Sequence, residues 1–268
     1  MKSLMSLMLL GSLSLFCQCS ATAASDDASE KTAINPASVP QERKEDVVYC
    51  AGTRNAVRIG QIDAANTDII FLGDSITHFW AFPETRKNAP GGLEIWDKTY
   101  KPLKAVNFGL IADKIENLLW RITEGKQLEG FSPKVIVLLI GVNNTHTGGG
   151  RVEMSAVQIA EGIKLIVDTI RQKQPESKIL LLGVFPRGGA AFMTKIKEIN
   201  NLISAYADNQ HVFFLDLCPQ LLEKDGTMSK EIFRDGLHIT PKGYQIWADA
   251  MNPLLFKLIN KDESKEQK

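Results

Sequence analysis

Short apolar runs alternate with longer amphipathic stretches along most of the chain. Five runs of mostly apolar residues are bounded by turn-forming residues, which is typical of strands buried on both faces. The predicted strands cover residues 69–72, 103–108, 135–140, 179–184 and 212–215. The pattern therefore predicts a sheet whose strands are separated by longer connections.

Between these runs, apolar residues recur at helical spacing. The predicted helices cover residues 54–65, 93–99, 113–124, 153–174, 192–208 and 241–259. Pro253 lies inside the last of them and predicts a kink or a break there. Strands that alternate with helices indicate a parallel sheet with helices on both faces. We expect an α/β fold, a three-layer α/β/α sandwich with a five-stranded parallel sheet, in one domain over residues 47–260.

The two ends of the chain do not follow this pattern. Residues 1–23 combine Lys2, an apolar stretch and an Ala21-Thr22-Ala23 site, which indicates a signal peptide and a secreted or periplasmic protein. Cys17 and Cys19 leave lipoprotein anchoring as an alternative, although their neighbours fit a lipobox poorly. Residues 24–46 are polar and predicted to be a disordered lead-in, and residues 261–268 form a charged tail.

Composition narrows the choice of function. The 268 residues are 44% hydrophobic and 23% charged, with a formal net charge of zero. A chain without net positive charge has no overall attraction for nucleic acid or for anionic membranes. We therefore expect no nucleic-acid partner and no stable membrane insertion. Cys50 and Cys218 would remain after signal removal, as a disulfide or as two free thiols. Neither has metal-ligand spacing, and we expect no metal and no cofactor.

Candidate chemistry begins where the first predicted strand ends. Gly73, Asp74 and Ser75 follow its apolar residues directly. Ser75 would lie at the carboxyl edge of the sheet, where open α/β sheets bind ligands. It is a candidate nucleophile, and the alternative is a serine that only caps the next helix.

A serine nucleophile needs a base, which is usually a histidine oriented by an acid. Of the four histidines, His238 has the most suggestive neighbourhood, because Asp235 precedes it by three residues in a glycine-containing turn. We expect His238 to be the base and Asp235 to orient it. An incidental surface turn is the alternative.

Acyl transfer also needs donors for the oxyanion. Gly109 follows the second predicted strand and Asn143 follows the third, so both fall at the same sheet edge as Ser75. The backbone N–H groups of Ser75 and Gly109 and the side-chain amide of Asn143 are the candidate donors. The alternative is that Gly109 and Asn143 are ordinary turn residues.

These segments resemble the conserved blocks of the SGNH (GDSL) hydrolase family. The resemblance rests on Gly73-Asp74-Ser75-Ile76-Thr77, Gly109, Gly141-x-Asn143 and Asp235-x-x-His238 in that order. Further segments are similar to the platelet-activating-factor acetylhydrolase catalytic-subunit branch. They are residues 71–77, 137–144 and 181–188. The resemblance implies a flavodoxin-like fold and gives Ser75, His238, Asp235, Gly109 and Asn143 the roles reached above.

Two departures from the family pattern bear on the expected substrate. Asn144 stands where an aspartate is common, and the leader is unlike that of the intracellular acetylhydrolases. We expect a secreted serine esterase acting on short-chain esters, acetyl in the first place, on a carbohydrate. The alternatives are a lysophospholipase or lipase-type enzyme, a platelet-activating-factor-acetylhydrolase-like esterase, and a non-catalytic carbohydrate-binding module. Trp80, Phe82 and Trp96 could stack on sugars or pack under a loop, and Arg187 could touch substrate or cap a turn.

Overall fold

The computed structural model describes residues 34–43, 62–146 and 153–260. The predicted signal peptide, Cys50, the charged tail and most of the predicted helix over 54–65 lie outside these ranges. Within them, no helix combines the length and apolar character needed to cross a lipid bilayer.

The sheet has five parallel strands in the spatial order β2-β1-β3-β4-β5. The strands are β1 (Ile69–Gly73), β2 (Ala105–Gly109), β3 (Val135–Leu139), β4 (Lys178–Leu182) and β5 (Val212–Leu215). All five fall on predicted strands, with ends shifted by a few residues. The apolar runs set their positions because β1 and β3 are buried along their whole length.

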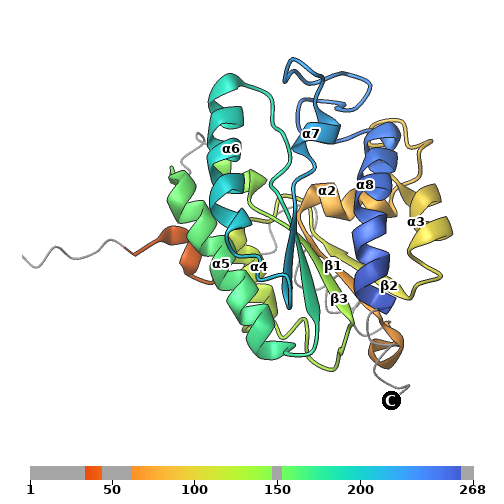
Figure 1. The fold of residues 1–268 in the computed structure, drawn as a ribbon, viewed down its shortest axis with the longest axis vertical. Helices are drawn as coiled ribbons and strands as arrows, with labels where there is room; N and C mark the ends of the chain where they lie inside the picture. Colours follow the sequence, from red (N-terminus) through yellow and green to blue (C-terminus); the bar gives the residue numbers. More distant parts are fainter. Residues whose placement is uncertain (1–33, 44–61, 147–152, 261–268) are drawn as a thin grey trace, which may run out of the picture. The chain divides into compact units, whose positions relative to one another are not determined.

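Helices cover both faces of the sheet, which confirms the three-layer α/β/α prediction (Figure 1). On one side are α4 (Ile115–Ile122), α5 (Ala156–Lys173) and α6 (Ala190–Ser204). On the other are α3 (Leu93–Thr99) and the long α8 (Pro241–Asn260). Two short helices, α2 (Ser75–His78) and α7 (Cys218–Leu221), and the 3₁₀ turns η1 (Pro36–Ser38), η2 (Ala64–Asn66), η3 (Phe79–Ala81) and η4 (Val142–Thr145) complete the described elements.

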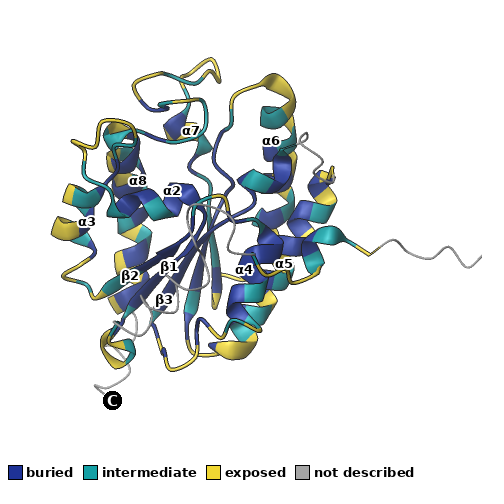
Figure 2. Ribbon diagram, turned by 180° about the vertical axis from the view of Figure 1, so that it is seen from behind, coloured by how far each residue is buried: buried dark blue, intermediate teal, exposed yellow. Residues whose placement is uncertain are grey.

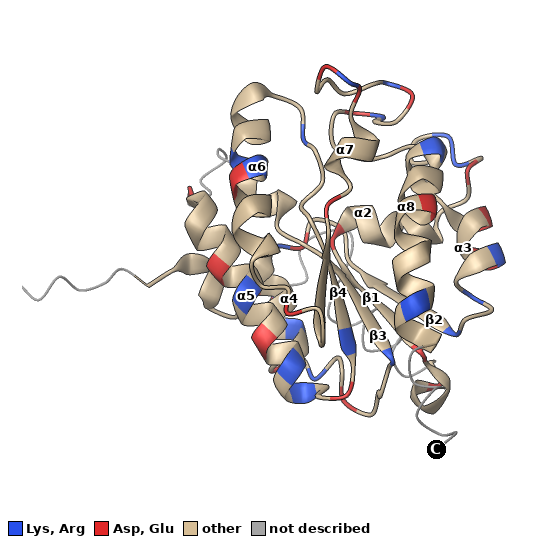
Figure 3. Cartoon of the chain, viewed as in Figure 1, with Lys and Arg blue, Asp and Glu red and all other residues tan. Residues whose placement is uncertain are grey.

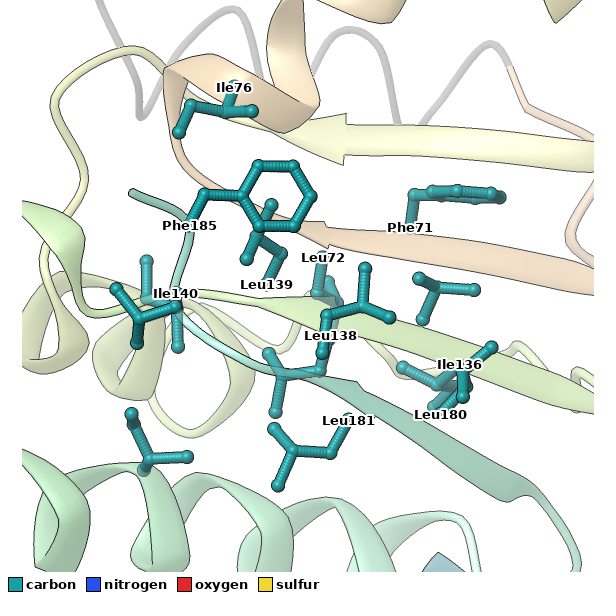
Figure 4. Close-up of a cluster of buried hydrophobic side chains, with 14 of the residues drawn as sticks. Phe71, Leu72, Ile76, Ile136, Leu138, Leu139, Ile140, Leu180, Leu181 and Phe185 are labelled. Carbon is teal, nitrogen blue, oxygen red and sulfur yellow. The ribbon is translucent and has the colours of Figure 1, made fainter. Parts of the chain in front are cut away.

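The core lies on both faces of the central strands. Figure 2 shows the sheet as buried, with exposed residues on the outer faces of the helices. Phe71, Leu138, Leu181 and Phe185 fill the space at the centre (Figure 4). Charged side chains of both signs are scattered over the helices and loops rather than gathered by sign (Figure 3).

The strand order explains where a site can form. β1 pairs with both β2 and β3, so the chain leaves β1 toward one side and then crosses to the other. The carboxyl edge at such a reversal opens a crevice between the connecting loops. Gly73 is in register with both Gly109 and Leu139, which brings the ends of three strands to one level.

Two expectations about the chain outside the sheet are wrong. Residues 34–43 of the predicted disordered lead-in pack against α4 and α5, so the ordered domain includes residues before 47. The break that was one of the two alternatives predicted at Pro253 is absent, since α8 continues to Asn260. Met251 and Leu255 on either side are fully buried, and this packing favours a helix despite the missing N–H of proline.

Candidate active site

The nucleophile candidate lies on a tight turn between β1 and α2. A Cβ on Gly73 would come within 2.4 Å of the Leu139 carbonyl oxygen, so only glycine fits at this turn. Asp74 caps α2 because its Oδ1 accepts a hydrogen bond of 2.9 Å from the Ile76 N–H. Asp74 is therefore the helix cap, and Ser75 follows it as the first helical residue.

His238 lies next to this serine although 163 positions separate them in sequence. The His238 Nε2 atom is 2.9 Å from the Ser75 Oγ atom. The loop that carries His238 is closed by an antiparallel bridge between Phe233 and Ile239 and by a bond from Arg234 N to His238 O. Ser75 and His238 thus have the geometry of a nucleophile and its base.

Asp235 holds the other side of the His238 ring. The Asp235 Oδ2 atom is 2.8 Å from His238 Nδ1, while Oδ1 accepts from the backbone N–H groups of Leu237 and His238. Partial burial raises the pKa of Asp235, but these bonds and the nearby His238 and Arg234 outweigh it and lower the pKa to about 2. Asp235 is therefore an ionised acceptor that keeps the Nδ1 proton on the histidine and leaves Nε2 facing the serine.

Asn143 reaches the same edge from η4, after β3. Its Nδ2 donates a 2.8 Å bond to the Asp113 carbonyl oxygen, which uses one of its two amide N–H groups. Within the described residues, that bond leaves the second amide N–H without a protein acceptor. Asn144 points away, since its Oδ1 accepts from Ile115 N and its Nδ2 donates to Glu116 Oε2. An aspartate at 144 could not donate to Glu116, which explains the departure from the family pattern.

The structure contradicts the predicted oxyanion role of Gly109. Its backbone N–H donates a 2.9 Å bond to Asn107 Oδ1, and the same side chain donates from Nδ2 to the Thr77 carbonyl. A Cβ on Gly109 would lie 2.3 Å from the His78 backbone nitrogen. Gly109 therefore allows β2 to approach α2 closely, and its N–H is already used.

Sequence reasoning missed a different residue on the loop after β2. Ala112 has a φ of +62°, a left-handed conformation that side chains with a Cβ rarely adopt. Among the described residues, none accepts a hydrogen bond from its N–H. It directly precedes Asp113, the residue whose carbonyl holds Asn143. An alanine carries no sequence signal for such a role, because the feature is a backbone conformation.

Buried charges lie behind the nucleophile. Arg121 on α4 contacts the Phe108 carbonyl at 2.7 Å and forms an ion pair with Asp113, at 2.9 Å between Nε and Oδ2. Burial raises the pKa of Asp74 to about 7, with Asp113 adding to the rise and the Ile76 N–H and Arg121 opposing it. Burial likewise raises the pKa of Asp113, while Arg121 and Arg43 act to lower it.

A cavity of about 360 Å³ adjoins the His238 side of the site. Arg187 and Phe192 line it, with the guanidinium 4.6 Å from the centre of the phenylalanine ring. Trp80 and Trp96 lie elsewhere, in the aromatic core, with 0% and 8% of their surface exposed. Both tryptophans are therefore core residues that are too buried to stack on a sugar. Arg187, in contrast, lines the same cavity as His238.

Two further sequence questions concern metals and cysteines. Within the described ranges, no cluster of three or more histidine, cysteine or acidic side chains is arranged to hold a metal ion. The Cys218 thiol lies near Val184 and Asn200, and burial raises its pKa. Cys50 lies outside the described residues, so the choice between a disulfide and two free thiols is untested.

Known proteins are similar to this chain in sequence and in fold. A match to the GDSL-like lipase/acylhydrolase family covers residues 71–246, which include Ser75, Asn143 and His238. Platelet-activating factor acetylhydrolase IB subunit alpha1 of Bos taurus is 32% identical over 200 residues, 73% of this chain and 78% of its own. Subunit alpha2 of Rattus norvegicus is 33% identical over 204 residues, 75% of this chain and 80% of its own.

Solved structures confirm the fold at lower identity. A GDSL-like lipase from Bacteroides thetaiotaomicron superposes with a TM-score of 0.61 at 18% identity, covering 76% of this chain and 97% of that one. A carbohydrate esterase of family 3 from Talaromyces cellulolyticus has a TM-score of 0.55 at 18% identity, with 73% and 99% covered. The α/β fold described above is therefore the fold of these hydrolases.

Proposed function

Because the chain belongs to the GDSL-like lipase/acylhydrolase family and is an ester-hydrolysing enzyme, we propose that it is a secreted serine esterase that removes acetyl and other short acyl groups from carbohydrates. The observation that carries the mechanistic part is the hydrogen-bonded series Ser75–His238–Asp235. The signal-like residues 1–23 support the secretion part.

The chemistry follows from the direction of these hydrogen bonds. Ser75 Oγ attacks the ester carbonyl carbon as its proton passes to His238 Nε2, and the imidazolium then protonates the leaving alcohol. Water then attacks the acyl carbon as its proton passes to the same nitrogen, and the imidazolium returns that proton to Ser75 Oγ as the acid leaves. Asp235 stabilises the imidazolium in both steps because its carboxylate stays ionised. No metal or organic cofactor takes part in this scheme.

The oxyanion needs donors that do not reorganise during the reaction. We assign the backbone N–H groups of Ser75 and Ala112 and the remaining amide N–H of Asn143, in place of the Gly109 N–H. Each comes from a loop that follows a different strand, at the sheet edge where β1, β2 and β3 end level.

Limited space at the serine favours a short acyl group. Ser75 is only 3% exposed, and the Phe79 ring lies 5.0 Å from the His238 ring. A long acyl chain would have to displace packed side chains, which costs binding energy. The cavity beside His238 would take the alcohol half of the ester. Two names among the similar proteins support an acetyl ester and a carbohydrate as the proposed substrate, namely platelet-activating factor acetylhydrolase and carbohydrate esterase.

Replacing Ser75 with alanine tests the mechanism. Hydrolysis of 4-nitrophenyl acetate should fall by about 10⁴-fold or more, because the members of such a triad act as a unit. Ser204→Ala at the end of α6 is the control and should keep wild-type turnover. A Ser75→Ala variant with most of its activity would refute the assignment, as would a wild type that a fluorophosphonate does not label.

The substrate needs a separate experiment. Released acetate should be measured on a panel of acetylated oligosaccharides, alongside acetate and octanoate esters of 4-nitrophenol. Faster turnover of octanoate would favour the lipase-type alternative. Activity on an acetylated phospholipid but on no sugar would favour an acetylhydrolase like the alpha1 and alpha2 relatives. Sugar binding without any turnover would indicate a binding module.

A further inference from the structure

The short segment Ile34–Arg43, here called the strap, crosses α4 and α5 outside the α/β fold. At its start, Asn35 caps η1 and donates to the Gln158 carbonyl and to Glu161 on α5. Farther along, the Gln41 backbone N–H donates to the Glu116 carbonyl of α4 at 2.9 Å, and the Gln41 carbonyl accepts from Asn117 Nδ2 at 3.0 Å. The two Gln41 bonds hold the strap's last residues beside the loop that follows β2, whereas the Asn35 bonds fix only its beginning on α5.

Arg43 ends the strap and grips this loop at two points. Its Nη1 atom contacts the Ile111 carbonyl oxygen and lies 3.1 Å from the Asp113 Oδ1 atom. Asp113 has no exposed side-chain surface, and Arg43 has 15%. The two contacts fall on either side of Ala112 and therefore span the residue in the left-handed conformation.

That loop carries one of the oxyanion donors assigned above, the Ala112 N–H, and Asp113 on the same loop holds a second, the Asn143 amide. A left-handed alanine costs roughly 1–2 kcal/mol relative to ordinary backbone, so the surroundings must hold it in place. Asp113 holds it from two sides, since its carboxylate lies between Arg43 and Arg121. Its carbonyl in turn fixes Asn143. A movement of Asp113 would shift the Ala112 N–H and the Asn143 amide together.

We propose that Arg43 is a positioning residue for catalysis, and that the strap exists to bring its guanidinium to the oxyanion loop. This inference rests on the proposed serine esterase function. Arg43 does not touch the substrate, and it acts by fixing the Ala112 N–H and the Asn143 amide where they meet the substrate carbonyl oxygen, which becomes the oxyanion when Ser75 attacks. Rate should depend on it more than substrate affinity does, because oxyanion donors bind the transition state better than the ground state.

The test compares Arg43→Ala, Arg43→Lys and the control Asn35→Ala, which loosens the same strap at its other end. For Arg43→Ala we expect kcat to fall about 10- to 100-fold with KM within about threefold, since displaced donors cost rate rather than binding. Arg43→Lys keeps the charge but lacks the guanidinium geometry, and it should fall between this variant and the wild type. Asn35→Ala should keep kcat within about twofold.

A transition-state analogue supplies the second measurement. A small alkyl boronic acid forms a tetrahedral anion on Ser75, so its inhibition constant should weaken in Arg43→Ala by the same factor as kcat. An inhibition constant equal to that of the wild type would overturn the inference, as would equal kcat losses in Arg43→Ala and Asn35→Ala. If Arg43→Ala does not fold, Arg43→Lys decides by the same two measurements.

The two proposals can fail separately. If Ser75→Ala keeps its activity, the serine esterase mechanism is wrong and the role of Arg43 falls with it. If Ser75→Ala is inactive while both Arg43 variants match the wild type in kcat and in boronic acid inhibition, only the inference about Arg43 is wrong.

Discussion

Two aspartates of the candidate site, Asp235 and Asp113, are held in opposite ways. Asp235 is near the surface, with 45% of its side chain exposed, and its bonding partners lie within three residues in sequence. Asp113 is fully buried, and its charged partners are Arg43 and Arg121 from other parts of the chain. One carboxylate is fixed by its own turn and the other by the assembled fold.

This difference sets what each carboxylate can do. Hydrogen bonds outweigh burial at Asp235 and lower its pKa to about 2, so it is available as an anion to the base. Burial dominates at Asp113 and Asp74 and raises the pKa of both, and Asp113 is balanced by two arginines. We infer that the exposed acid contributes to reaction rate and that the buried acids contribute to the shape and stability of the edge.

The largest effect is expected at Asp235. Asp235→Asn should lower kcat by about 10⁴-fold, because an amide cannot hold the Nδ1 proton and stabilise the imidazolium. Its melting temperature should stay close to that of the wild type, since the side chain is half exposed. Asp225→Asn is a matched control, because Asp225 accepts from the Thr227 N–H in a similar exposed turn. A loss of stability as large as the loss of rate would contradict the distinction drawn here.

Arg121 should show the reverse behaviour. Arg121→Met leaves the buried Asp113 carboxylate with only Arg43 and should lower the free energy of unfolding by about 3–5 kcal/mol. Urea titration of this variant beside Arg86→Met, which removes an exposed arginine over Phe82, measures the difference. An Arg121→Met protein within about 1 kcal/mol of the wild type would show that the ion pair adds little to stability.

Asp74 should give a smaller effect that depends on pH. Its pKa is about 7 in the folded protein against 3.8 for an ordinary aspartate, so folding retains a proton between these values. The free energy of unfolding of the wild type therefore falls as pH rises through that window, because ionisation favours the unfolded state. Asp74→Asn removes the titrating group and with it this fall. Between about pH 5 and about pH 8, the free energy of unfolding of the variant should rise by about 3 kcal/mol relative to that of the wild type, measured by denaturant titration. A difference independent of pH would contradict the raised pKa.

The sequence predicted those features that depend on residues close to one another along the chain. The apolar runs located all five strands, and Asp235-x-x-His238 forms a local turn whose bonds could be expected from spacing. The prediction that the Gly109 N–H is an oxyanion donor was wrong, because this N–H donates to the Asn107 side chain, a bond that the sequence does not reveal. Ala112 and Arg43 left no signal, since their roles come from a backbone dihedral and from a partner 70 positions away. A polar composition is common both in disordered segments and in segments anchored by hydrogen bonds. The strap was therefore predicted to be disordered.

The level ending of β1, β2 and β3 also has a consequence for how the enzyme acquires activity during folding. β1 pairs with partners from residues 105 and 135 onward, contacts that close long loops and form slowly. Ser75 meets the loops after β2 and β3 only when both pairings are complete. In a refolding experiment, hydrolysis should therefore return after the helices have formed and together with burial of the sheet. The recovery of hydrolytic activity would then report when the three central strands have assembled.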